Sequence, residues 1–165
     1  MRFVPDRIFD RMDDITPDVL QTAHIRGLVL DIDYTLAPRD VPLPDDDTVR
    51  LIRRLRQAGV GLYILSNNHK GRVSLFAQAL DVPFTCNSMK PFPGAFRRAV
   101  QAMGLTPGET AAVGDQIYTD VFGAHLAGLK AWMVRPVGQG TSIFYRIRHG
   151  LEQPFIRRYY RMGGK

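Results

Sequence analysis

The chain of 165 residues contains a single cysteine, Cys86, and no long apolar run. One cysteine excludes an intramolecular disulfide framework and suits a reducing compartment. No apolar segment approaches the roughly 18 residues of a transmembrane helix, and residues 1–21 carry acids without an apolar core. We therefore expect neither a membrane span nor a signal peptide, and we predict a cytoplasmic protein that is at most peripheral at the inner face of a membrane.

Acidic side chains are scarce towards the C-terminal end. Residues 1–134 hold 15 basic and 15 acidic side chains, whereas residues 135–165 hold seven basic side chains and one acid, Glu152. The net charge of +6 therefore comes entirely from the last 31 residues. A basic end of this kind suits an anionic partner, which could be a lipid surface, a nucleic acid or an acidic protein.

Apolar segments of strand length alternate with segments of helical periodicity. We expect strands at 27–32, 61–65, 83–85, 110–113 and 130–134, and helices at 16–24, 45–58, 70–80, 93–103 and 118–126. This alternation predicts an α/β fold: one doubly wound, Rossmann-like domain with a five-stranded, mostly parallel sheet and helices on both faces. The domain should span residues 1–140, followed over 141–165 by a basic, aromatic helical extension that is either part of the same domain or peripheral to it.

Two carboxylates, Asp31 and Asp33, follow the apolar run Gly27-Leu28-Val29-Leu30. Side chains two apart on an extended backbone project the same way, here at the carboxyl end of a strand, where α/β sheets bind ligands. Two like charges so close are unfavourable unless a cation or a proton compensates. The pair therefore indicates a divalent metal, acid–base chemistry, or both, although a turn with local side-chain hydrogen bonds is the structural alternative.

Further polar landmarks follow the later strands. Ser66-Asn67-Asn68 comes after 60–65, Lys90 stands in Met89-Lys90-Pro91, and Gly114-Asp115 comes after 111–113, with Asp120 five residues on. In this order and spacing the chain resembles the haloacid dehalogenase (HAD) superfamily of aspartate-nucleophile phosphatases. More narrowly it resembles the YqeG-type phosphatases of subfamily IIIA, which are related to phosphatidylglycerophosphate phosphatases. Tyr34 departs from the usual Asn, for which we expect altered access rather than lost chemistry.

The resemblance implies roles for the acids. Asp31 would be the nucleophile that forms an aspartyl-phosphate, and Asp33 would protonate the leaving oxygen and then activate water. Mg²⁺ would be held by Asp31, the backbone carbonyl of Asp33 and Asp115. Asp120 would support the site from behind the metal ligands or through a water molecule, although an acid in the first turn of a helix is also favourable by itself.

The resemblance also implies a phosphate-binding set. Ser66 and the amide of Asn67 would bind the transferred phosphoryl group, Lys90 would neutralise a phosphate oxygen, and Thr35 would fix the loop after Asp33. The structural alternatives are a helix cap for Ser66 and an ordinary surface position for Lys90.

The spacing leaves no room for a lid domain. Only 32 residues separate Asp33 from Ser66, and 23 separate Ser66 from Lys90, whereas a lid would need roughly 50 more. The site should therefore be open. An open site suits a phosphate carried on something large, or one that is shielded by another subunit of a homo-oligomer.

The favoured hypothesis is a Mg²⁺-dependent phosphomonoesterase, with a phosphorylated substrate that could be the lipid-borne phosphatidylglycerophosphate. Basic residues interleaved with large apolar ones over 141–165 can lie at an anionic membrane surface. Alternatively, Phe144, Ile147 and Leu151 dock this segment on the core. Two other functions remain open: a phosphatase of a soluble phosphosugar or nucleotide with a neighbouring subunit as lid, and, less favoured, an RNA- or ribosome-associated binding factor on a HAD fold.

Overall fold

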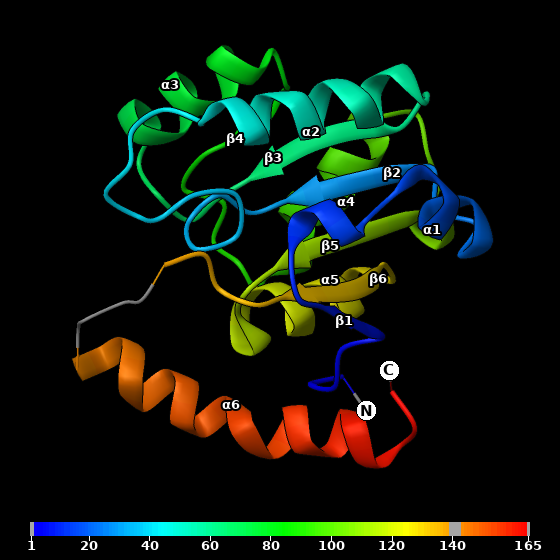
Figure 1. Ribbon diagram of the computed structural model, residues 1–165, viewed down its shortest axis with the longest axis vertical. Coiled ribbons are helices and arrows are strands. Elements are labelled where there is room, and N and C mark those ends of the chain that lie inside the picture. The colour runs from blue at the N-terminus through cyan, green and yellow to red at the C-terminus, as the bar shows by residue number, and fades with distance from the viewer. Residues whose placement is uncertain (1, 139–142, 165) are drawn as a thin grey trace.

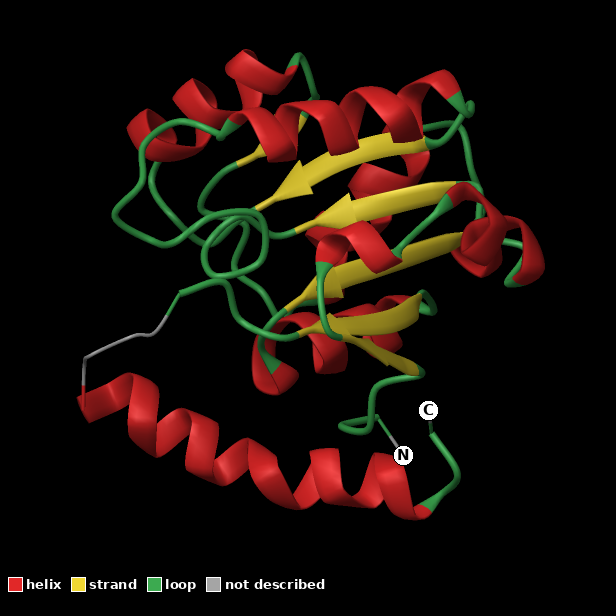
Figure 2. Cartoon of the chain, in the orientation of Figure 1, coloured by secondary structure: helices red, strands yellow, loops and turns green. Residues whose placement is uncertain are grey.

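The computed structural model describes residues 2–138 and 143–164, and its centre is a parallel sheet (Figures 1 and 2). The six strands pair in the order β1-β6-β5-β2-β3-β4, and every pair is parallel. In chain order the strands are β1 (Arg7–Phe9), β2 (Gly27–Leu30), β3 (Gly61–Leu65), β4 (Phe84–Thr85), β5 (Thr110–Gly114) and β6 (Lys130–Val134). The α-helices are α1 (Pro17–Thr22), α2 (Asp46–Gln57), α3 (Lys70–Leu80), α4 (Pro93–Ala102), α5 (Phe122–Ala127) and α6 (Ile143–Arg161).

The predicted fold class is confirmed, but the sheet has one strand more than expected. β1 lies at the sheet edge, where Arg7 pairs with Trp132 and Phe9 with Val134. Three partly exposed residues carry no detectable period, so the sequence pattern could not reveal this strand. The helix predicted at 118–126 also differs, because it begins with a π-helical turn, Ile117–Val121, before α5.

Helix starts follow ordinary capping chemistry. The side chain of Thr16 accepts a hydrogen bond from the N–H of Val19 at 3.3 Å ahead of α1, and Asp45 Oδ1 accepts one from Thr48 at 2.8 Å ahead of α2. These caps place the helices where local sequence predicts them.

The helices form two layers, and each face of the sheet has its own apolar core. Leu28 and Leu30 face a cluster that includes Leu55 of α2 and Phe76 of α3. Val29, pointing the other way, faces a cluster that includes Phe96 of α4. Period-two alternation along β2 therefore serves two hydrophobic layers, and the polar residues beyond Leu30 remain for the sheet edge.

The helix α6 packs along the side of the domain near the N-terminal segment (Figure 1). The Phe155 ring lies 5.4 Å from that of Phe3, and the N–H of Ile8 donates to Tyr159 Oη at 3.2 Å. Ile147 and Leu151 are 56% and 58% exposed, so they do not dock on the core, and the side chain of Phe144 lies outside the described residues. Over the described residues, no helix is both long and apolar enough to cross a bilayer.

Candidate active site

The site forms where β2, β3 and β5 end side by side. Leu30 pairs with Ile64 on one side and Val113 on the other. The N–H of Asp31 still donates to the Val113 carbonyl at 3.0 Å, so Asp31 continues the β2–β5 ladder. Polar residues that follow different strands therefore meet at one rim of the sheet.

Three buried carboxylates gather at this rim, and one ammonium group pairs with two of them. Ligand oxygens of Asp31, Asp115 and Asp120 all lie within 4.8 Å of one another. Lys90 Nζ donates to Asp31 Oδ1 and to Asp120 Oδ1, each at 2.7 Å. Lys90 is 7% exposed and not a surface lysine, so the structural alternative for this residue is wrong.

Buried carboxylates are costly to ionise, and the pKa of Asp31 reflects this cost. Burial raises the pKa of Asp31 to about 7, reinforced by the Asp120 and Asp33 charges and only partly opposed by Lys90. Burial alone would lower the pKa of Lys90, but the carboxylates of Asp120 and Asp31 outweigh it and raise that pKa. Lys90 is therefore a permanent cation, whereas burial makes the charged form of Asp31 costly.

Gly114 lets Asp120 approach the strand end. A Cβ at residue 114 would lie 2.3 Å from Asp120 Cγ, a distance that real contacts exclude. The other oxygen of Asp120 accepts a hydrogen bond from the Gln116 N–H at 3.2 Å. The π-helical turn and Gly114 together bring Asp120 beside Lys90.

Asp33 lies outside the carboxylate cluster, although it is only two residues from Asp31. Its Oδ2 accepts a hydrogen bond from Asn68 Nδ2 at 2.8 Å, and its Oδ1 lies 3.3 Å from Arg72 Nη2. The Asp33 side chain is 15% exposed and faces the pocket described below. Asp31 and Asp33 thus have different cationic partners, Lys90 for the first and Arg72 for the second.

The segment after β3 holds the backbone around Lys90 in place. Asn67 Oδ1 accepts hydrogen bonds from the Lys90 N–H at 2.7 Å and from Ser88 Oγ at 2.8 Å, and its amide nitrogen donates to the Lys90 carbonyl at 3.0 Å. Ser66 Oγ accepts one from the Asn68 N–H at 3.1 Å, while His69 caps α3. Ser66 is therefore not the helix cap that the structural alternative suggested.

The turn after Asp33 has a tight backbone. Tyr34 adopts a φ of 63°, a conformation in which Asn is enriched and a bulky residue is strained. The carbonyl of Ile32 accepts from the Thr35 N–H at 3.1 Å, and the Thr35 hydroxyl is buried without a hydrogen bond to any described residue. Thr35 thus sits inside the turn, where its backbone contributes to the loop.

A pocket of about 390 Å³ opens above these residues. Asp31, Asp33, Ser66, Asn67 and Lys90 line it. Sequence reasoning assigned no role to several other lining residues, namely Arg39, Asn68, His69, Asn87, Gln116 and Thr119. Of these, only Asn68 had a local signal, because it belongs to the Ser66-Asn67-Asn68 motif.

The donor set suits a hard divalent cation. Three carboxylates within bonding reach of one centre offer only oxygen ligands, which Mg²⁺ prefers. A dication would also favour the charged forms of these buried carboxylates. The residues present therefore fit a magnesium ion.

Comparison with known proteins agrees with this geometry. The family model for haloacid dehalogenase-like hydrolases matches residues 6–128. The chain belongs to the haloacid dehalogenase-like hydrolases. A protein of Bacillus subtilis (strain 168) named "Probable phosphatase YqeG" is 31% identical over 161 residues, covering 98% of this chain and 94% of that protein. The predicted membership of the superfamily is confirmed, and the protein is a phosphatase of this family.

Solved structures of the family share the fold at lower identity. A subfamily III A hydrolase of the HAD superfamily from Legionella pneumophila matches with a TM-score of 0.56 at 18% identity, covering 86% of this chain and 94% of that one. The 3-deoxy-D-manno-octulosonate 8-phosphate phosphatase of Moraxella catarrhalis, solved with magnesium and phosphate ions, matches with a TM-score of 0.55 at 15% identity. That match covers 86% of this chain and 98% of the other.

Proposed function

We propose that the protein is a Mg²⁺-dependent phosphomonoesterase that works through an aspartyl-phosphate on Asp31. The observation that carries the proposal is the cluster of Asp31, Asp115 and Asp120. Lys90 pairs with Asp31 and Asp120, and Asp31 and Lys90 line a pocket. The magnesium and phosphate ions in the Moraxella catarrhalis relative support the same chemistry.

The chain's own groups can perform both halves of the reaction. A carboxylate oxygen of Asp31 attacks phosphorus, and the bond from phosphorus to the leaving oxygen breaks. Asp33 gives that oxygen a proton, then takes one from the water that attacks the phosphoryl group on Asp31. Phosphate leaves and Asp31 is restored. Lys90, with the Ser66 hydroxyl and the backbone N–H of Asn67, compensates charge on the phosphate oxygens.

Asp31, Asp115 and the backbone carbonyl of Asp33 would hold Mg²⁺, with Asp120 kept in place by Lys90. When bound, the ion supplies positive charge that lets an anionic nucleophile approach an anionic ester.

A lipid-borne substrate, phosphatidylglycerophosphate, is the proposed natural ester. Arg39 lines the pocket, is exposed, and makes no hydrogen bond or ion pair with any described residue. Such a guanidinium suits a substrate with a second anionic group, and phosphatidylglycerophosphate carries a phosphodiester beside its terminal phosphate.

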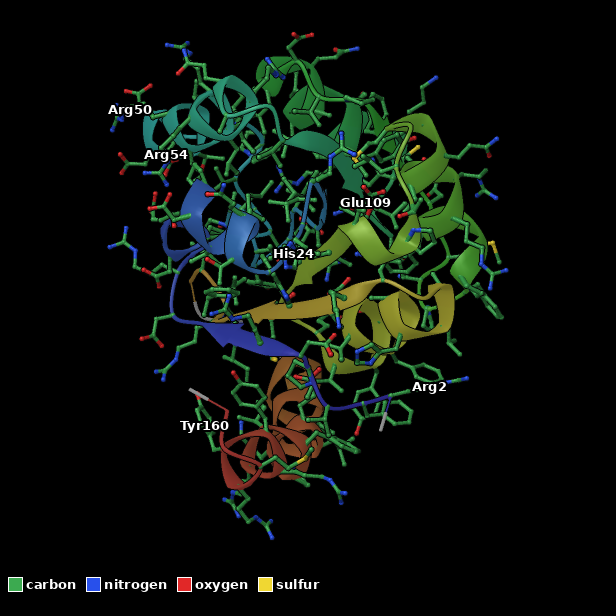
Figure 3. The ribbon with its side chains drawn as sticks, turned by 90° about the vertical axis from the view of Figure 1, so that its right-hand side faces the viewer. Arg2, His24, Arg50, Arg54, Glu109 and Tyr160 are labelled. Carbon is green, nitrogen blue, oxygen red and sulfur yellow. The ribbon has the colours of Figure 1, made fainter. Side chains whose placement is uncertain are left out.

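The outer face of α6 supports work at an anionic membrane surface. It exposes Ile147 and Leu151 together with Arg158 and Arg161, whereas Phe155 and other residues face the domain. Tyr160, 47% exposed, also lies on the surface of α6 (Figure 3). Apolar side chains among arginines favour the interface of an anionic bilayer.

The test of function is phosphate release. Wild type and Asp31→Asn are assayed with p-nitrophenyl phosphate, a phosphosugar and phosphatidylglycerophosphate, each with Mg²⁺ or EDTA. We expect Mg²⁺-dependent release that Asp31→Asn abolishes, with the highest kcat/KM on the lipid. A preference for the phosphosugar would favour the soluble substrate instead, and inert protein that binds RNA in a salt-sensitive way would favour the binding factor.

The membrane surface is tested separately with sedimenting vesicles of phosphatidylcholine, with or without equimolar phosphatidylglycerol. The variant Arg158→Glu/Arg161→Glu should lose binding to the anionic vesicles by more than about tenfold, since each basic residue contributes about 1 kcal/mol. Arg53→Glu/Arg98→Glu, on exposed positions of α2 and α4, is the charge-matched control. Equal binding to neutral and anionic vesicles would contradict the proposal.

A further inference from the structure

Arg72 is an arginine of α3 that is turned into the protein rather than into solvent. It is 9% exposed, and its guanidinium lies over the Phe76 ring, 5.3 Å from the centroid. Its Nη2 lies 3.3 Å from Asp33 Oδ1 and donates to the Pro38 carbonyl at 3.2 Å, while Nη1 donates to the Val41 carbonyl. Burying a cation is costly unless it is paired, so these contacts must hold it in place.

We propose that Arg72 is the positioning residue for Asp33, acting through the guanidinium that holds both the Asp33 carboxylate and the loop that follows it. The inference rests on the proposed acid–base role of Asp33. It assigns no contact with substrate to Arg72, which acts only by fixing where the Asp33 carboxyl group stands.

Two donors determine the orientation of the Asp33 carboxyl group. Arg72 Nη2 donates to Asp33 Oδ1 at 3.3 Å, and Asn68 Nδ2 donates to Asp33 Oδ2 at 2.8 Å. Lys90 meanwhile pairs with Asp31 and Asp120, and in the described part of the chain it makes no hydrogen bond or ion pair with Asp33. Asp31 thus pairs with Lys90, and Asp33 pairs with Arg72. This division keeps Asp33 out of the cluster and at the pocket wall, where a leaving oxygen would need its proton.

The contacts require an arginine rather than any cation. A guanidinium has five donors in a planar fork, so it can reach a carboxylate and two carbonyls together. An ammonium on a flexible stem would keep the charge but lose the fork. Because Pro38 and Val41 flank Arg39, the same side chain also fixes the loop that carries this pocket-lining residue.

Substrates whose leaving groups differ in basicity can distinguish a positioning role of Arg72 from a purely structural one. An alkyl alkoxide needs a proton from Asp33 as its bond to phosphorus breaks, whereas p-nitrophenolate is stable without one. The value of kcat/KM covers the steps up to that cleavage. A displaced Asp33 therefore lowers kcat/KM for an alkyl phosphate much more than for p-nitrophenyl phosphate, whereas partial unfolding lowers both equally.

The experiment compares glycerol 3-phosphate with p-nitrophenyl phosphate in wild type, Arg72→Lys, Arg72→Gln and Asp33→Asn, with folding checked by thermal melts. For both Arg72 variants we expect kcat/KM on glycerol 3-phosphate to fall about 10- to 100-fold, as for a misplaced catalytic group. On p-nitrophenyl phosphate the fall should be less than about threefold. Arg56→Lys is the matched control, because Arg56 also bonds a backbone carbonyl and pairs with a carboxylate, at the other end of α3.

A double-mutant cycle completes the test. In an Asp33→Asn background, Arg72→Gln should cause little further loss on glycerol 3-phosphate, because its effect passes through Asp33. Equal losses on both substrates, or a full additional loss in that background, would overturn the inference while the enzyme itself remains a phosphatase. Wild type without Asp31-dependent release on either ester would instead overturn the proposed function, and the inference with it.

Discussion

The carboxylate of Glu152 in α6 accepts a hydrogen bond from the backbone N–H of Ile117 at 2.8 Å, and both residues are buried. Ile117 begins the π-helical turn that carries Asp120. In the same turn, Tyr118 Oη donates to the Leu151 carbonyl of α6 at 3.0 Å. The π-helical turn therefore joins α6 to the carboxylate cluster.

Replacement of Glu152 tests this junction. Glu152→Ala leaves the buried Ile117 N–H without its acceptor, so we expect the free energy of unfolding to fall by about 1–3 kcal/mol. Glu152→Gln retains an amide oxygen that can accept the bond and should cost less. Urea denaturation measures both. A Gln variant that is as unstable as the Ala variant would show that the negative charge, and not this hydrogen bond, dominates.

Gly114→Ala should impair catalysis more than folding. The new Cβ would overlap Asp120, which must then move away from Lys90. We expect kcat/KM to fall at least about tenfold, because misplacement near a reacting centre is costly. Gly108→Ala is the control, since a Cβ there meets nothing within 4 Å. Similar activity in the two variants would mean that Asp120 can shift freely.

Mg²⁺ should stabilise the folded protein through Asp115. A ligand at about 100 times its Kd adds about 2.7 kcal/mol to stability, so the thermal midpoint should rise with Mg²⁺ and fall back with EDTA. Asp115→Asn should remove that shift, whereas Asp47→Asn, at an exposed position of α2, should retain it. An unchanged shift in Asp115→Asn would place the ion elsewhere.

His125 should make the attachment of the N-terminal segment depend on pH. Its Nε2 lies 3.0 Å from Asp6 Oδ2 and its Nδ1 lies 2.8 Å from the Arg2 carbonyl, so both ring nitrogens donate only when the ring is protonated. The hydrogen bond to Asp6 raises the pKa of His125 above 6.5. The contact is therefore fully present below pH 6.5 and is lost as pH rises through the raised pKa.

His125→Gln measures this contribution. The difference in thermal midpoint between wild type and variant should be larger at about pH 5.5 than at about pH 8.5. At acidic pH the contribution is lost once the Asp6 carboxylate is protonated. Burial alone would raise the pKa of Asp6, but the hydrogen bond from His125 outweighs it and holds that pKa below 3.8. A difference that does not change with pH would indicate that neutral His125 makes the same contacts.

Local sequence predicts much of the fold because burial and capping act locally. The expected strand at 61–65 and helix at 70–80 coincide with β3 and α3, whose apolar residues have clear periods. The meeting of Asp31, Lys90 and Asp115 also follows from the order of the motifs, since the ends of parallel strands share one rim.

The partners of Asp33 could not be predicted in this way. Arg72 is 39 residues from Asp33, and in the sequence it resembles any arginine at the start of a helix. Its burial depends on how α3 packs against the loop around Pro38 and Val41, which is a tertiary outcome. The same holds for Glu152, an isolated acid in a basic segment that is buried only because α6 docks where Ile117 presents its N–H.

The most direct test of the central claim is mass spectrometry of acid-quenched enzyme after turnover of p-nitrophenyl phosphate with Mg²⁺. We predict one phosphoryl group on Asp31, which accumulates further in Asp33→Asn because the attacking water then lacks its base. A phosphoryl group on any other residue, or turnover by Asp31→Asn at the wild-type rate, would contradict the account.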